Sequence, residues 1–226
     1  MKYNENELAS IQGGFIPLLV SCDKHICQEW HNGVNYLNLL SIPLSIPQIE
    51  GLIYEFGGKI KLTPPVNIMK WFAILSNGFF PVYTNIRPLN QMAQSDKVDM
   101  LHDIYGHVPY LINPKFNTVC KFFGDSWVSC DKKHHESLIK LWFYIIEFSV
   151  IYQKENLLAF GGGLITSNYF LNKFINGDIE VQESDICEIL NSNISITGSP
   201  ERLFSFGSVD DIFTLLTSGV EHVIKS

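Results

Sequence analysis

The stretch from Leu141 to Gln153 is uncharged and mostly apolar, except for one side chain, Glu147. It forms most of a predicted helix that runs from Glu136 to about Gln153. A helix that is apolar on nearly all sides lies inside a protein core. A carboxylate buried there costs free energy unless a cation pairs with it or a metal ion binds it. The sequence therefore predicts a buried site around Glu147, whose partner is either a distant Arg or Lys or a metal ion.

The composition supports a large core and narrows the class of protein. With 226 residues, 46% hydrophobic and 13% aromatic content but only 17% charged residues, the chain fits one globular domain. The net charge of −7 and the lack of a Lys/Arg cluster argue against a nucleic-acid partner. No apolar run is long enough to span a bilayer, and five irregularly spaced cysteines predict reduced thiols. We therefore expect a cytoplasmic protein that binds neither nucleic acid nor membrane.

Periodicity and chain-breaking residues predict a mainly α fold with minor β, of the α+β class. Most segments have apolar residues at helical spacing, and only short alternating or β-branched runs indicate strands. Residues 1–45 carry the weakest pattern. Beyond them we expect helices over about 46–56, 67–76, 98–105 and 136–153, from about 167 and from 209, with β structure over 59–63 and 80–86.

Two histidines, His102 and His107, are the sharpest local feature. Histidines four residues apart share a helix face, but a spacing of five at about 100° per residue separates them. We therefore predict that the helix unwinds at Gly106, so that His107 turns back towards His102. Together with the Glu147 carboxylate, two imidazoles would make a facial set of three ligands. Such a set suits Fe(II) with open positions for oxygen, and it also suits a hydrolytic zinc site. Solvated histidines are the alternative interpretation.

Four ordered segments resemble the aromatic amino acid hydroxylases, the family of phenylalanine, tyrosine and tryptophan hydroxylases. They are 80–87 (FPVYTNIR), 102–116 (HDIYGHVPYLINPKF), 141–148 (LWFYIIEF) and 159–167 (AFGGGLITS). They are similar to the stretch ending in the substrate arginine, the iron-binding signature, the helix with the third ligand and the glycine-rich segment after it. The resemblance covers about residues 46–213 and identifies the chain as a short, divergent member of bacterial type.

The resemblance implies roles for ten residues. The iron ligands, which form the catalytic centre, would be His102, His107 and Glu147. The residues that bind substrate would be Arg87, Ser95, Phe143, Gly163 and Thr166. The residues that contact the pterin would be Trp71, by ring stacking, and Asp103. A guanidinium such as that of Arg87 pairs with an amino acid carboxylate through two hydrogen bonds. The alternative interpretation is that the aromatic residues only pack in the hydrophobic core and that Arg87 belongs to a structural ion pair.

The resemblance also implies an activity. It is that of a non-haem Fe(II), tetrahydropterin-dependent monooxygenase that uses O2 to hydroxylate the ring of an aromatic amino acid. The cofactors would be Fe(2+) and tetrahydrobiopterin or a bacterial relative of it, and the protein would be a monomer or a small homo-oligomer. The expected organisation is a divergent N-terminal segment over residues 1–45 and a single iron-binding, hydroxylase-like catalytic domain over residues 46–226.

Three departures from the family pattern keep other functions open. Asp103 stands where the family has Glu, Pro81 occupies a position that is often His, and the pterin loop over residues 63–69 is shortened. They motivate a related Fe(II) oxygenase that acts on a specialised metabolite or a non-standard amino acid. They also motivate a non-catalytic homologue that only binds a metal or an amino acid. A zinc hydrolase is the remaining alternative.

Overall fold

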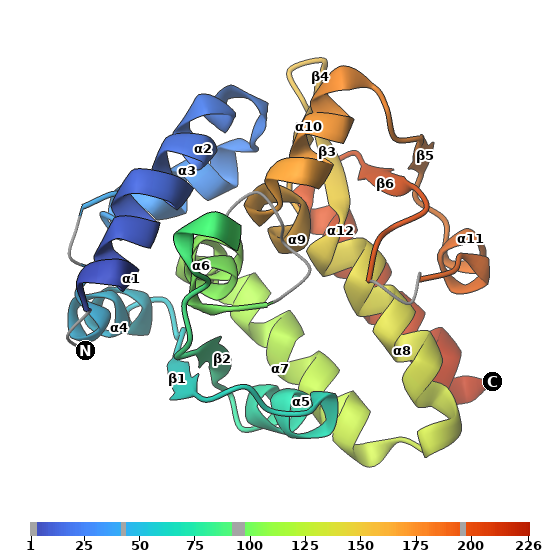
Figure 1. Ribbon diagram of the computed structural model, residues 1–226. Coiled ribbons are helices and arrows are strands. Elements are labelled where there is room, and N and C mark those ends of the chain that lie inside the picture. Colours follow the sequence, from blue (N-terminus) through green and yellow to red (C-terminus); the bar gives the residue numbers. More distant parts are fainter. Residues whose placement is uncertain (1–3, 42–43, 92–97, 195–197) are drawn as a thin grey trace.

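The computed structural model describes residues 4–41, 44–91, 98–194 and 198–226, which form a mainly helical fold with two small sheets (Figure 1). The predicted mainly α fold with minor β is confirmed. Within the described ranges, no helix combines the length and the apolar character needed to cross a membrane.

The first helices of the chain pack behind the segment that carries the two histidines. The indole N–H of Trp30 donates to the carbonyl of Tyr105 at 2.6 Å. Gly33 lies so close to Pro109 that a Cβ at this position would meet the Pro109 carbonyl oxygen at 2.0 Å. The segment before residue 45 thus supports the histidine segment directly. Its elements are α1 (Glu5–Ala9), η1 (Ser10–Phe15), α2 (Ile16–Ser21), η2 (Asp23–His25) and α3 (Gln28–Tyr36).

A two-stranded parallel sheet and the helix between its strands follow α4 (Ile46–Tyr54). The sheet pairs β1 (Ile60–Thr63) with β2 (Phe80–Tyr83), and α5 (Ile68–Ser76) connects them. The side chain of Asn67 caps α5 by accepting the N–H of Lys70 at 2.9 Å. Just past its end, Gly78 adopts a φ of +78°, which glycine takes at little cost.

Three helices in the second half of the chain pack around the centre of the molecule. They are α7 (Pro114–Ser129), α8 (His135–Trp142) and α12 (Val209–Lys225); α12 packs on both others, and α5 packs on α7. The shorter elements in this half are α6 (Met100–His102), η4 (Asp103–His107), η5 (Val108–Ile112), η6 (Lys132–His134), η7 (Phe143–Glu147), α9 (Gly162–Thr166), α10 (Asn168–Asn176) and α11 (Ile186–Asn191), preceded by η3 (Leu89–Gln91).

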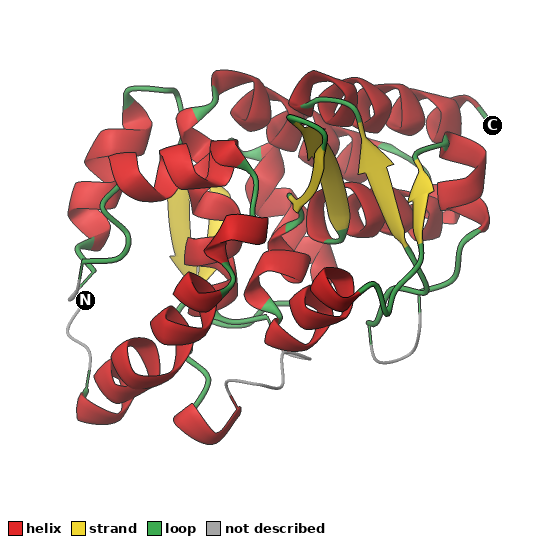
Figure 2. Ribbon diagram, turned by 90° about the horizontal axis from the view of Figure 1, so that it is seen from above, coloured by secondary structure: helices red, strands yellow, loops and turns green. Residues whose placement is uncertain are grey.

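The second sheet has four strands in the order β4-β3-β6-β5. The strand β3 (Ser149–Gln153) pairs antiparallel with β4 (Asn156–Ala159) and parallel with β6 (Leu203–Phe206), which also pairs with β5 (Val181–Glu183). The two sheets lie apart, with helices between and around them (Figure 2).

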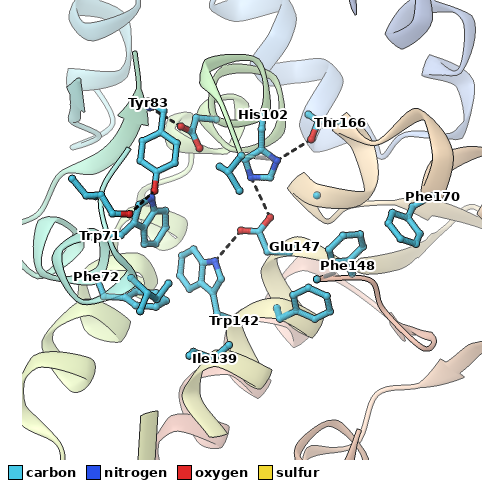
Figure 3. A pocket seen from close by; sticks show the side chains of 17 residues that line it. Trp71, Phe72, Tyr83, His102, Ile139, Trp142, Glu147, Phe148, Thr166 and Phe170 are labelled. Carbon is cyan, nitrogen blue, oxygen red and sulfur yellow. Dashed lines mark hydrogen bonds and ion pairs between the residues drawn. The ribbon is translucent and has the colours of Figure 1, made fainter. Parts of the chain in front are cut away.

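The helix expected over residues 136–153 is shorter than predicted. The helical backbone ends with Glu147, and Phe148 leaves the helical region with φ −131° and ψ 58°. The next residues form β3 because Val150 and Ile151, which are β-branched and buried, pair with strands on both sides. Glu147 therefore lies at a junction between helix and strand, where its side chain points into a pocket (Figure 3).

Candidate metal centre and pocket

A π-helical turn brings His102 and His107 together, so the predicted unwinding at Gly106 is wrong. The short helix α6 carries His102, and η4 follows it with backbone hydrogen bonds that span five residues. Such a turn places residues five apart near one another, and the two Nε2 atoms lie 3.1 Å apart. Gly106 is needed for another reason: a Cβ there would lie 2.9 Å from the carbonyl oxygen of Gly162.

Glu147 ends a second π-helical turn and completes the cluster. Its Oε1 lies 3.2 Å from His107 Nε2, and its Oε2 lies 3.4 Å from His102 Nε2. One ligand atom from each of the three side chains lies within 4.8 Å of the others. Among the described residues this is the one group of at least three His, Cys, Asp or Glu side chains close enough to hold a metal ion. Two imidazoles and one carboxylate suit iron or zinc.

The hydrogen bonds around His102 fix which of its nitrogens faces the cluster. The hydroxyl of Thr166 donates to the Gly162 carbonyl at 2.7 Å, so its oxygen accepts the hydrogen bond at 3.0 Å from His102 Nδ1. Nδ1 therefore carries the proton, and Nε2 presents a lone pair towards His107 and Glu147. A hydrogen bond to the far ring nitrogen is the usual support of a metal-binding histidine.

The charges of the cluster are coupled. Burial raises the pKa of Glu147, but His107 and His102 outweigh burial and hold that pKa well below its ordinary value. Burial lowers the pKa of His102, but Glu147 outweighs it and raises that pKa. For His107 burial dominates, and its pKa is lowered. The carboxylate is therefore ionised at neutral pH, as a metal ligand must be.

The glycine-rich segment before and within α9 packs directly on the ligand-bearing residues. A Cβ at Gly162 would lie 2.4 Å from Cε1 of the His107 ring, and one at Gly161 would lie 2.3 Å from the carbonyl oxygen of Glu147. A Cβ at Gly163 would lie 3.0 Å from the ring of Phe148. These positions therefore need glycine for close approach.

A cavity of about 350 Å³ opens beside the cluster (Figure 3). Aromatic rings make most of its wall, and His102, Glu147 and Thr166 supply polar atoms on one side. A mostly apolar pocket with a few convergent polar groups is typical of a small-molecule site. The aromatic lining residues are Trp71, Phe72, Tyr83, Trp142, Phe143, Phe148 and Phe170.

Most of the residues expected at the site line this cavity. They are Trp71, His102, Asp103, Phe143, Glu147, Gly163 and Thr166. His107 is buried behind the wall, with its Nε2 directed at the cluster. Arg87 is not among the lining residues, and Ser95 lies outside the described residues.

Asp103 is a buried acid at the edge of the cavity. Its Oδ2 accepts the backbone N–H of Tyr83 at 2.7 Å, whereas its Oδ1 makes no hydrogen bond with a described residue. Burial raises its pKa to about 7. Burial therefore favours the protonated form of Asp103 far more than water does.

Arg87 is held by Asp99, which falls in the first turn of the helix expected over residues 98–105. Asp99 is instead the N-cap of α6, and its Oδ1 accepts the N–H of His102 at 3.0 Å. The same carboxylate pairs with the Arg87 guanidinium at 2.8 Å. An N-cap aspartate before a short helix was the available sequence signal for this contact.

Trp142 was also missed as a polar contact. Its indole N–H donates to Glu147 Oε1 at 2.9 Å, and the ring lines the cavity (Figure 3). A spacing of five does not bring two residues together on a regular helix. The contact therefore depends on the π-helical turn, which the sequence did not predict.

Comparison with known proteins gives a consistent result. The family model described as "Biopterin-dependent aromatic amino acid hydroxylase" matches residues 1–225. The phenylalanine-4-hydroxylase of Vibrio cholerae is 27% identical over 62% of this chain and 50% of its own length. That of Chromobacterium violaceum is 27% identical over 83% of this chain and 65% of its own length. The chain spans about half the length of the first of these relatives.

Solved structures share the fold. A phenylalanine hydroxylase from Legionella pneumophila superposes with a TM-score of 0.87 at 18% identity, over all of this chain and 90% of its own. The Chromobacterium violaceum enzyme with bound iron(III) and 7,8-dihydrobiopterin superposes with a TM-score of 0.84 at 21% identity, over 98% of this chain and 82% of its own.

Proposed function

Because the chain belongs to the biopterin-dependent aromatic amino acid hydroxylase family, we propose that it is an Fe(II)- and tetrahydropterin-dependent monooxygenase. In this proposal it uses O2 to hydroxylate the ring of an aromatic amino acid. The observation that carries the proposal is the convergence of His102, His107 and Glu147 beside an aromatic cavity. The cytoplasmic location, the monomeric or small homo-oligomeric state and the division at residue 45 stay predictions.

The donor set fits a ferrous ion. Two imidazole nitrogens and one carboxylate oxygen face a common point, and His102 has the tautomer that a metal ligand needs. We assign these three residues as the iron ligands and the catalytic centre. The bound ion would activate O2 with electrons from the pterin, and the chain's side chains would bind and orient the reactants.

The cavity has features that suit a tetrahydropterin. Trp71 is buried, lines the wall and would offer its ring to the flat bicyclic cofactor. Asp103 Oδ1 has no hydrogen-bond partner among the described residues and would accept an N–H of the pterin. The apolar walls would exclude water from the reacting groups.

The amino acid would lie on the other side of the cluster. Phe143, Gly163 and Thr166 line the cavity and would form its subsite, with Ser95 as a further predicted contact. We propose that Arg87 binds the substrate carboxylate, with Asp99 holding the Nε and Nη2 edge of the guanidinium in place. A guanidinium fixed in this way is well suited to a carboxylate ligand.

The experiment is an aerobic assay with Fe(II), tetrahydrobiopterin and each aromatic amino acid, analysed by mass spectrometry. Phenylalanine is tested first, because the named relatives are phenylalanine-4-hydroxylases. We expect a product with one added oxygen, formed only when iron and pterin are both present. The variant Glu147→Gln, which keeps the side-chain size but removes the charge, should form none. A wild-type protein that binds iron but neither hydroxylates an amino acid nor oxidises pterin would refute the proposal.

A further inference from the structure

Trp142 and Glu147 are related to each other as His102 and His107 are. In each pair, the first residue immediately precedes a five-residue π-helical turn, and the second is the last residue of that turn. In η7 the N–H of Phe148 bonds the carbonyl of Phe143 at 2.9 Å and closes the turn. Two π-helical turns therefore build the site, one by joining two ligands and the other by joining a ligand to an indole.

The indole N–H fixes the orientation of the Glu147 carboxylate. Trp142 Nε1 donates to Oε1 at 2.9 Å. Oε2 makes no hydrogen bond with a described residue and lies 3.4 Å from His102 Nε2. The hydrogen bond to Oε1 thus fixes the rotation of the carboxylate, with Oε1 at 3.2 Å from His107 Nε2 and Oε2 directed at His102.

Trp142 is itself held firmly. Its ring packs edge-on against Trp71 at 5.3 Å and Phe72 at 5.5 Å, and it is tilted against Phe123 at 5.0 Å. Only 6% of the residue is exposed. An anchored donor holds its acceptor more precisely than a mobile one. Trp71, whose ring is proposed to stack on the pterin, is thus also a packing partner of the Trp142 indole.

We propose that Trp142 is a positioning residue for the metal centre, which orients the carboxylate of Glu147 through its indole N–H. This inference rests on the proposed function, since it needs His102, His107 and Glu147 to bind a metal. It assigns Trp142 no contact with the reacting atoms. Loss of the N–H should weaken metal binding and change the ligand field while the fold persists.

The test is the binding of Co(II) alone, under anaerobic conditions, to the purified protein. The variant Trp142→Phe removes the N–H and keeps an aromatic ring. The matched control is Trp127→Phe: Trp127 is 1% exposed, its indole N–H has no partner among the described residues, and it does not line the cavity. We expect a 10- to 100-fold higher dissociation constant for Trp142→Phe, an altered visible Co(II) spectrum, and wild-type values for the control.

A shape-matched replacement separates the hydrogen bond from packing. Benzothienylalanine at position 142 replaces the N–H by sulfur and keeps the bicyclic ring. This protein tests the role of the hydrogen bond even if Trp142→Phe does not fold. We expect it to weaken Co(II) binding as Trp142→Phe does. Wild-type affinity and spectrum in the benzothienyl protein would overturn the inference while the metal centre stands. A wild-type protein that binds no Co(II) would instead refute the metal centre itself.

Discussion

The carboxylate of Asp99 holds Arg87 at three points. Its Oδ2 accepts the Arg87 backbone N–H at 2.7 Å and the guanidinium Nε at 2.9 Å, and its Oδ1 accepts Nη2 at 2.8 Å. Both side chains are buried. Because the same carboxylate caps the helix that carries His102, one residue joins the proposed substrate arginine to a proposed iron ligand.

Replacing Asp99 by Asn should destabilise the protein strongly. The change keeps the size of the side chain but removes the negative charge that Asp99 offers to the buried guanidinium of Arg87. Breaking one side of a buried ion pair costs about 3–5 kcal/mol. Urea unfolding, followed by circular dichroism, measures the loss. The control is Asp210→Asn, which breaks an ion pair with Lys115 whose side chains are 67% and 68% exposed. That variant should stay within about 0.5 kcal/mol of wild type, and equal losses in the two would contradict the argument.

Much of the architecture was predictable because its signals are local. Helical spacing and chain-breaking residues indicated α5 and α12, and the lone charge of Glu147 in an apolar stretch indicated a buried polar site. The end of the helix at Glu147 was not predictable in this way. Whether Val150 and Ile151 continue a helix or join a sheet depends on β6, a strand some fifty residues later in the chain.

The residue types indicated which side chains form the site, but the backbone geometry that brings them together was not predictable from the sequence. The resemblance pointed to His102 and His107, yet regular helix geometry placed them on different faces. The π-helical turn that joins them is stabilised by tertiary packing, such as the close approach of Gly106 to Gly162. The same limitation hid the hydrogen bond of Trp142. Sequence periodicity assumes a regular helix and cannot reveal contacts that need an irregular one.

Adding a methyl group at Gly162 should damage the metal centre. The Cβ of Gly162→Ala would lie 2.4 Å from the ring of His107, so the imidazole or the helix must shift. We expect at least a tenfold loss of Co(II) affinity and a destabilisation of about 1–3 kcal/mol, as for other overpacked sites. Calorimetric titration and urea unfolding measure the two effects.

The control for that change is Gly51→Ala in α4. Gly51 is exposed, and nothing lies within 4 Å of a Cβ added there. Alanine has a higher helix propensity than glycine, so this variant should gain about 0.5–1 kcal/mol in stability with unchanged metal affinity. A loss of metal affinity in both variants would show that the effect of Gly162→Ala is not local.

Replacing Thr166 by Val should weaken metal binding through His102. The change keeps the branched shape and removes the oxygen that accepts the hydrogen bond from His102 Nδ1. Loss of such support typically lowers metal affinity 10- to 100-fold. The control is Thr217→Val, which removes a hydroxyl bonded to the Phe213 carbonyl in α12, away from the cavity. Unchanged Co(II) affinity in Thr166→Val would show that this hydrogen bond does not support the metal centre.

The last prediction concerns Cys27, a fully buried thiol 3.4 Å from the hydroxyl of Tyr110. That hydroxyl donates to the carbonyl of Phe160 at 2.6 Å, so the thiol is the donor to Tyr110. Burial raises the pKa of Cys27 from 9.0 to about 12. The protonated thiol is therefore strongly favoured in the folded protein.

The raised pKa of Cys27 sets the sign of a pH effect on stability. Above pH 9 the thiol loses its proton in the unfolded chain but keeps it in the folded one, so the stabilisation is complete below pH 9 and is lost as the pH rises towards 12. Between pH 9 and pH 10.5 wild type should lose about 1.5 kcal/mol more unfolding free energy than Cys27→Ala, because all other titrating groups are shared. Urea unfolding at each pH measures the difference. Parallel pH profiles for the two proteins would mean that Cys27 ionises alike in the folded and unfolded chain, and the buried position of the thiol would then be wrong.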